Sequence, residues 1–146
     1  MHIDDPLNAI SPIDGRYAKT GEKLSDYFSE YALIKYRLIV MARYLIALGH
    51  EETVPLSPFT DSEELALTRR VKEISLDEAN IVKLIETKGW HNFPRTNHDV
   101  EACKLWLRHT LQEMGLGRAV EFVHIGRTSE DVNNIAHALQ IKDGRE

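Results

Sequence analysis

The sequence predicts an all-α fold, and three features of the chain indicate this class. No segment shows the alternation of apolar and polar residues that is typical of a β-strand. Residues 25–48 contain neither glycine nor proline and are rich in apolar side chains. Pairs of the form Ser/Thr-x-x-Asp/Glu, which favour the start of a helix, precede apolar stretches at several places.

Glycine and proline divide the first part of the chain. Residues 1–24 contain two prolines and two glycines, which predict an extended arm with turns. We expect residues 25–48 to form a central, largely buried helix, because their apolar side chains cover too many faces for a surface helix. Gly49 stands in the usual position after a helix, and Pro55 and Pro58 predict a loop.

Four further helices are expected, each beginning at a pair whose side chains can satisfy each other's backbone N–H groups. The pairs are Thr60 with Glu63, Ser75 with Glu78, Thr96 with Asp99, and Thr128 with Asp131. The first three helices are expected to end near Ile74, Lys88 and Met114. A turn at 115–117 is the predicted domain boundary, and a short apolar element follows at 119–125. The last helix is amphipathic, and we expect its apolar face to lack a partner because no later segment follows it.

Length and composition narrow the class of protein. The chain has 146 residues, enough for one domain of ordinary size. Its mean hydropathy of -0.34 and the lack of a long apolar run predict no membrane-spanning helix. A net charge of -5 argues against a nucleic-acid partner, which would need a basic surface. The single cysteine, Cys103, excludes an intrachain disulfide, and the acidic N-terminus does not resemble a signal peptide, so a cytoplasmic location is expected.

Three polar clusters are candidates for a binding site. In the first, at 11–17, Pro12 and Gly15 predict a turn from which Arg16 and Tyr17 project. A guanidinium group suits phosphate or carboxylate, and the tyrosine hydroxyl adds a donor. An ordinary surface turn with an exposed arginine is the alternative.

The second cluster, at 95–99, lies where a helix is expected to begin. Free N–H groups and the helix dipole favour an anion at such a position. His98 could donate a hydrogen bond or a proton near neutral pH, and Asn97 could orient a carboxylate or an amide. Capping by Thr96 and Asp99 is the alternative, but it does not explain the other polar residues of the cluster.

The third cluster, at 126–134, offers a similar site. Gly126 allows a ligand to approach the backbone closely, and Thr128 and Ser129 add hydroxyl groups to the free N–H groups of the last helix. The arrangement suits a carboxylate or a phosphate, with helix capping again as the alternative. The histidines show no metal-binding spacing such as His-Glu-x-x-His, so we predict neither a metal nor another cofactor.

In their order and spacing, these clusters resemble the N-terminal part of the adenylosuccinate lyases, a family of the fumarase/aspartase superfamily, and in particular its longer bacterial branch. The segments that carry the resemblance are Ser11 to Tyr17, Ser29 to Tyr31 with Leu33 and Lys35, Thr96 to Ala102, Phe122 to His124, and Thr128 to Asn134. The resemblance spans essentially the whole chain. It implies an N-terminal helical lyase domain at residues 1–117, with the arm at 1–24, and the truncated beginning of the central helical bundle at 118–146.

The resemblance also implies a reaction and a substrate. The family eliminates fumarate from adenylosuccinate, giving AMP, and from the succinyl-carboxamide intermediate of purine biosynthesis. Arg16 and Tyr17 would then bind the nucleotide phosphate, and Thr128 and Ser129 would hold a succinyl carboxylate at the helix N-terminus.

Asn97, His98 and Asp99 would line the substrate pocket, and His98 would orient the succinyl group or assist the acid. Arg127 departs from the family pattern, which often has a less charged residue there. In the family, a loop serine acts as the base and a histidine as the main acid, and both belong to the segment after the one that this chain resembles. The chain alone is therefore predicted to be inactive. Full-length members of the family are homotetramers.

Two alternatives remain open. A sister lyase, such as argininosuccinate lyase or aspartase, would share the fold, but its substrate has no phosphate for Arg16 and Tyr17 to bind. A stand-alone helical module that binds a nucleotide or a partner would be favoured by a natural stop codon directly after residue 146.

Overall fold

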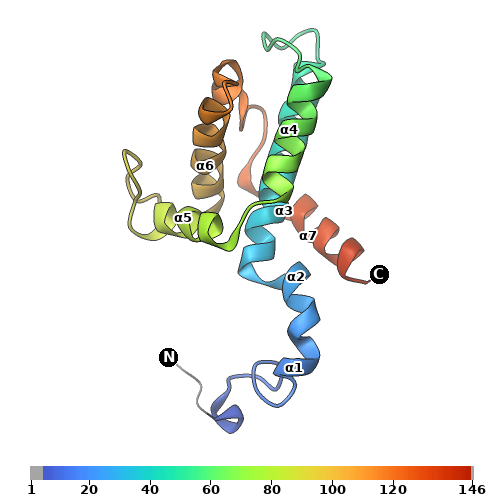
Figure 1. Cartoon of the computed structure of the whole chain (residues 1–146), viewed down its shortest axis with the longest axis vertical. Coiled ribbons are helices and arrows are strands. Elements are labelled where there is room, and N and C mark those ends of the chain that lie inside the picture. The colour runs from blue at the N-terminus through green and yellow to red at the C-terminus, as the bar shows by residue number, and fades with distance from the viewer. Residues whose placement is uncertain (1–4, 146) are drawn as a thin grey trace.

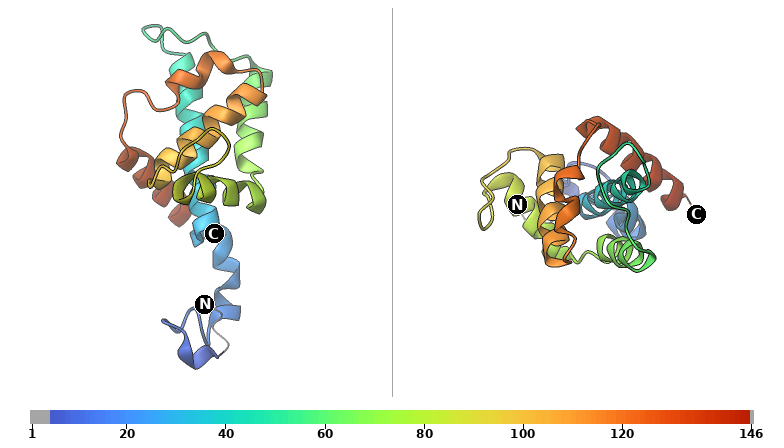
Figure 2. Two further views of the ribbon diagram at one scale, coloured as in Figure 1. Left: turned by 90° about the vertical axis from the view of Figure 1, so that its left-hand side faces the viewer. Right: turned by 90° about the horizontal axis from the view of Figure 1, so that it is seen from above.

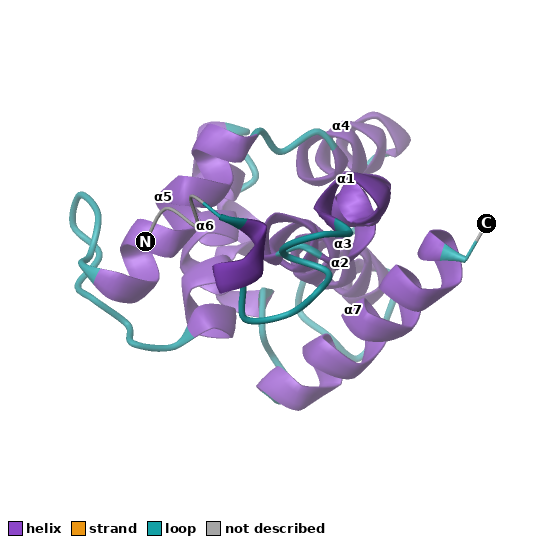
Figure 3. Cartoon of the chain, turned by 90° about the horizontal axis from the view of Figure 1, so that it is seen from below, coloured by secondary structure: helices purple, strands orange, loops and turns teal. Residues whose placement is uncertain are grey.

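The computed structural model describes residues 5–145, and these form helices joined by loops (Figures 1 and 3). The α-helices are α1 (Ala18–Gly21), α2 (Ser25–Phe28), α3 (Glu30–Gly49), α4 (Asp61–Lys72), α5 (Leu76–Thr87), α6 (Asp99–Glu113) and α7 (Ser129–Gly144). Short 3-10 helices occur at Pro6–Asn8, Glu22–Leu24 and Gly117–Phe122. Within the described residues, β pairing is limited to an isolated bridge between Trp90 and Phe93, which confirms the predicted all-α class.

Helix α3 forms the centre of the core, as its apolar composition predicts. It contacts α4, α5, α6 and α7, and its residues Leu38, Met41 and Leu45 are fully buried. Figures 1 and 2 show α4 running alongside α3, whereas α7 crosses it. Helices α5 and α6 also pack on each other, so their apolar surfaces meet more than one neighbour, whereas α4 and α7 pack mainly on α3. In the part of the chain that the structure describes, no helix is long and apolar enough to span a membrane.

The prediction of one continuous helix over residues 25–48 is wrong at a single residue. Ser29 has an extended backbone, with ψ of 165°, and separates α2 from α3. Its hydroxyl accepts a hydrogen bond from the N–H of Ala32 at 3.1 Å, as an N-cap residue does. Ser29 thus starts a new helix inside a stretch that contains no glycine or proline.

The arm is also less extended than predicted. Residues 5–24 form short helical turns, and the carboxylate of Asp5 starts the first of them by accepting from the N–H of Leu7 at 2.8 Å. Residues 1–4 of the predicted arm lie outside the described residues. The arm projects from the body of packed helices, at the lower end of the molecule in Figure 1 and in the left view of Figure 2.

Three of the four predicted helix starts are confirmed. Thr60 and Ser75 each form a capping box with the glutamate three residues later. At the start of α7, the Asp131 carboxylate accepts from the N–H of Thr128 at 2.7 Å. Such local pairs satisfy N–H groups that the helix itself leaves free, so they act wherever the helix later packs.

The fourth predicted start, at Thr96 with Asp99, is wrong. The N-cap of α6 is His98, whose Nδ1 accepts from the N–H of Glu101 at 3.4 Å. The N–H of Thr96 donates instead to the carbonyl oxygen of Ile85 at 3.1 Å, which holds this segment against the end of α5. The residue after Thr96 has a left-handed φ of 51°, which a right-handed helix cannot include, so the helix begins only after His98.

The apolar face of α7 finds its partner earlier in the sequence. Val132 and Ala136 are fully buried where α7 packs on α3. The hydroxyl of Tyr36 on α3 donates to Asp143 Oδ2 at 2.8 Å, near the far end of α7. Ile135 remains 52% exposed, so the outer part of this face is open. The expectation that this face has no partner is therefore wrong for its inner half.

A bidentate ion pair joins the start of α4 to the 3-10 helix after α6. Arg118 donates to both carboxylate oxygens of Glu63, at 3.0 and 2.7 Å. These hydrogen bonds, followed by the one from the Thr60 N–H, lower the pKa of Glu63 to about 2. The stabilisation from this pair is complete above the pKa that glutamate has in the unfolded chain, and it is lost as the pH falls towards 2.

Replacing Arg118 by glutamine is expected to return the pKa of Glu63 towards its ordinary value, because the charged donor is lost. A side-chain carboxyl NMR titration measures this pKa directly. Arg69→Gln removes the same charge from the last turn of α4 and should leave the Glu63 titration unchanged. An unchanged pKa in Arg118→Gln would show that the ion pair does not hold the carboxyl group in its ionised form.

Candidate functional site

A buried arginine in the middle of α3 joins the second and third polar clusters. Arg37 is only 6% exposed, although arginine is rarely buried without a charged or polar partner. Its Nη2 lies 2.7 Å from Oδ2 of Asp99 in the first turn of α6. Its Nε donates to Oδ1 of Asn133 in α7 at 2.9 Å. One guanidinium group therefore holds the N-terminal ends of α6 and α7 together.

Asp99 keeps its negative charge in this position. Partial burial raises the pKa of its carboxyl group, but the charge of Arg37 and the N–H of Val100, which donates at 2.8 Å, lower it further, so the net shift is downward. Both members of the Arg37–Asp99 pair are therefore charged. Hydrogen bonds between charged groups are stronger than those between neutral ones, so this link is a firm one.

His98 lies beside this link with its side chain 50% exposed. Its Nδ1 accepts from the N–H of Glu101, which places the proton of the neutral ring on Nε2. The same Nδ1 lies 3.5 Å from Oδ1 of Asp99. His98 can therefore offer its Nε2–H as a donor to a ligand at the start of α6.

Asn97 shapes the turn that precedes His98. Its φ of 51° is left-handed, a conformation that asparagine adopts more readily than most residues. Its Oδ1 accepts from Nη2 of Arg95 at 2.8 Å. The amide nitrogen of Asn97 is then the group that remains to meet a carboxylate.

The two hydroxyl groups at the start of α7 differ in their availability. Asp131 Oδ2 accepts from the N–H of Thr128 at 2.7 Å and from its hydroxyl at 3.2 Å. The Thr128 hydroxyl is thus engaged within the cap. Ser129 is the first residue of the helix and is partly exposed, so its hydroxyl is better placed to bind a ligand.

The first cluster lies apart from the other two. Arg16 and Tyr17 are both exposed, and the guanidinium carbon of Arg16 lies 5.0 Å from the centre of the Tyr17 ring. They precede α1 in the projecting arm (Figure 1), away from the start of α7. Of the three predicted clusters, the structure therefore brings together the second and third.

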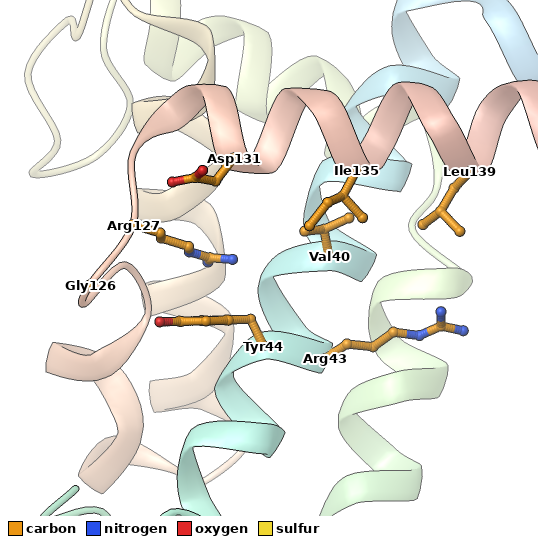
Figure 4. Close-up of a pocket in the computed structure, with 8 residues that line it drawn as sticks. All are labelled: Val40, Arg43, Tyr44, Gly126, Arg127, Asp131, Ile135 and Leu139. Atoms are coloured by element: carbon orange, nitrogen blue, oxygen red, sulfur yellow. The ribbon is translucent and has the colours of Figure 1, made fainter.

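A pocket of about 490 Å³ opens between α3 and α7 (Figure 4). Its wall is mainly apolar and includes Val40, Ile135 and Leu139. Arg127 and Tyr44 lie close together at one end of it, beneath the start of α7. Arg127 thus belongs to the segment that leads into the third cluster.

The contacts of Arg127 fix the loop that precedes α7. Its Nη2 donates to the carbonyl oxygen of Val123 at 2.6 Å, and its guanidinium carbon lies 4.4 Å from the centre of the Tyr44 ring. The Tyr44 hydroxyl donates to the carbonyl oxygen of Ile125 at 2.9 Å. Burial lowers the pKa of Arg127. These contacts give the charge at this position a structural role, which is to hold the loop on α3.

The sequence reasoning missed Arg37 and did not single out Asn133. The apolar stretch 25–48 holds several charged residues, which was a usable signal because a charge in a buried helix requires a partner, but it did not distinguish Arg37 from the others. The identity of that partner could not be predicted from the sequence, since Asn133 lies 96 residues further along the chain. Among the described residues no group of three potential metal ligands occurs.

The chain is similar to known proteins over nearly all of its length. No family model matches the chain. The chain is 41% identical to the adenylosuccinate lyase of Legionella pneumophila (strain Corby), over 93% of this chain and 29% of that protein. It is 37% identical to the adenylosuccinate lyase of Escherichia coli (strain K12), over 96% of this chain and 30% of that protein. It is 38% identical to the adenylosuccinate lyase of Dictyostelium discoideum, over 96% of this chain and 29% of that protein. The chain thus spans about 30% of the length of these relatives, and over nearly all of its own length it is homologous to the N-terminal portion of the adenylosuccinate lyases.

Proposed function

We propose that this chain forms part of the substrate pocket of an adenylosuccinate lyase that acts in purine biosynthesis, in AMP and IMP formation, as a cytoplasmic homotetramer. The observation that carries the proposal is the convergence of the second and third clusters on Arg37, in a chain whose curated relatives are adenylosuccinate lyases. The reaction would remove a proton next to a carboxylate and protonate the departing nitrogen of the purine nucleotide, with release of fumarate.

The residues of this chain would bind and orient the substrate. The Ser129 hydroxyl and the N–H groups of the first turn of α7 would hold a succinyl carboxylate, since a helix N-terminus favours an anion, and Thr128 would line the site while its hydroxyl stays bonded to Asp131. His98 would donate its Nε2–H to the succinyl group or assist the acid, with Asn97 and Asp99 beside it. Such donors would stabilise the negative charge that develops when the proton is lost.

The arm would supply the nucleotide end of the pocket. Arg16 and Tyr17 would bind the phosphate, because a guanidinium group and a phenol hydroxyl both donate to phosphate oxygens. The main base and acid would come from other parts of the whole protein. We therefore expect the 146-residue chain to bind ligand weakly, with Kd on the order of 1 mM, and not to turn it over.

An NMR titration of the labelled chain tests the proposal, with adenylosuccinate, AMP and fumarate as separate ligands. Fumarate is expected to shift the amide signals of residues 97–99 and 128–129, and AMP those of residues 16–17. Ser129→Ala should weaken fumarate binding about tenfold and leave AMP binding unchanged. The start of α7 should stay folded in this variant, because the cap between Thr128 and Asp131 does not involve Ser129. Arg16→Ala is the matched variant and should weaken the binding of AMP but not that of fumarate.

The two alternative functions, a sister lyase and a nucleotide-binding module, predict different results in this titration. Equal affinity for argininosuccinate and adenylosuccinate would favour a sister lyase, and binding of AMP without any response to fumarate would favour a nucleotide-binding module. A continuous assay for fumarate tests the inactivity of the chain: turnover by the chain alone at the rate normal for the family would contradict the assignment of base and acid to other parts of the protein.

A further inference from the structure

We infer that Arg37 is a positioning residue that sets the distance and orientation between the two ligand-binding helix starts, of α6 and of α7. The inference rests on the proposed function, in that it explains how the two halves of that pocket are held in register. Arg37 itself lies in the core and is 6% exposed, so it acts through its partners and does not touch a ligand.

The partners of Arg37 are adjacent to the groups that would meet the substrate. Asp99 directly follows His98. Asn133 lies four residues after Ser129, and residues at this spacing share one face of a helix. A shift of either partner would therefore move the corresponding ligand group with it.

The other hydrogen bonds of these partners remain within their own helices. Asp99 also accepts from the N–H of Val100, the next residue of α6. Asn133 also donates to Glu130 of α7, at 3.5 Å. Arg37 is thus the group that connects the two polar ends across the helices, in the region that the structure describes.

The chemistry of arginine suits this task better than that of lysine. Nε and Nη2 lie along one edge of a rigid planar group, so the two donors have a fixed separation and direction. A lysine ammonium group is a point charge on a flexible chain. It could pair with Asp99, but it would not hold Asn133 at a defined angle at the same time.

Double electron–electron resonance between spin labels tests this inference without any ligand. Labels at Gln112→Cys on α6 and Ala138→Cys on α7 report the relation of the two helices, since both positions are exposed. Cys103 is fully buried and burial raises the pKa of its thiol to about 12, so it should not take up label in the folded protein. A second pair, Ala66→Cys with Gln112→Cys, reports α4 against α6 as the control.

Arg37→Met is expected to broaden or displace the α6–α7 distance distribution and to leave the α4–α6 distribution unchanged. Arg37→Lys should restore the position of α6 only in part, and Asn133→Ala should reproduce the broadening while Arg37 and Asp99 remain paired. Asn133→Ala also keeps the test decisive if Arg37→Met fails to fold, because it leaves no buried charge without a partner. An α6–α7 distribution identical to that of the wild type in a folded variant would overturn the inference.

Two further measurements separate positioning from stability. Arg37→Met should raise the pKa of Asp99 towards its ordinary value, because the charge of Arg37 opposes that rise in the wild type. In the fumarate titration, Asn133→Ala should raise Kd about tenfold and reduce the shift of the His98 amide at a given fumarate concentration, since the two helix starts are no longer held together. If the wild type does not bind fumarate, the proposed function is contradicted. If the Arg37 and Asn133 variants nevertheless change the α6–α7 distance distribution, the role of Arg37 in holding the two helices still stands.

Discussion

Replacing Leu38 by alanine is expected to lower the free energy of unfolding by about 2–5 kcal/mol, the range for leucine-to-alanine changes in well-packed cores. Leu38 is fully buried in α3, and the helices around it cannot all move inwards to fill the space. The loss therefore combines the transfer of the removed methyl groups with the cost of a cavity. Urea unfolding followed by circular dichroism measures the change.

Leu65→Ala is the matched control, since Leu65 lies on α4 and is 63% exposed. Its removal should change the free energy of unfolding by less than about 0.5 kcal/mol. Equal effects at the two positions would contradict the placement of α3 at the centre of the core.

Replacing Gly89 by alanine should cost about 2–4 kcal/mol, because two penalties add at this position. Gly89 follows α5 with a left-handed φ of 91°, which strains a residue that has a Cβ atom. A Cβ would also lie 2.8 Å from the carbonyl oxygen of Phe93, a backbone atom of the turn that leads towards α6.

The same substitution at Gly115 distinguishes the cost of backbone strain from the cost of the steric contact. Its φ of 74° is also left-handed, but a Cβ there would meet no atom within 4 Å. Gly115→Ala should therefore cost only the backbone strain, about 1–2 kcal/mol. Thermal unfolding of both variants gives the comparison, and a smaller loss for Gly89→Ala than for Gly115→Ala would contradict the close approach to Phe93.

The helix starts show how far sequence reasoning reaches in this fold. The pairs at Thr60, Ser75 and Thr128 were predictable because a capping box needs only residues three positions apart. Ser29 was missed because it begins a helix without a box, inside a stretch in which every residue suits a helix. Thr96 was misassigned because its N–H bonds to Ile85, a contact that the local sequence does not contain.

The candidate site shows the same division between local and distant information. His98, Thr128 and Ser129 were found as polar residues at expected helix starts. Their grouping was not predictable, because it depends on Arg37 and on the packing of α7 against α3. The roles of Arg16 and Tyr17 remain predictions, which rest on their donor chemistry and on the resemblance to the family, since the arm places them apart from the other clusters.

The packing of α7 on α3 also has a consequence for the order in which the protein assembles. The hydrogen bonds from Arg37 to Asn133, from Tyr36 to Asp143 and from Gln140 to Tyr27 span 96, 107 and 113 residues of sequence. Contacts of this range form late, because a long loop must close before any of them contributes. During synthesis, α7 is also the last of the described helices to leave the ribosome. A nascent chain can thus bury most of its core while the half of the pocket at Ser129 does not yet exist, and the proposed carboxylate site is expected to form only once α7 has packed on α3.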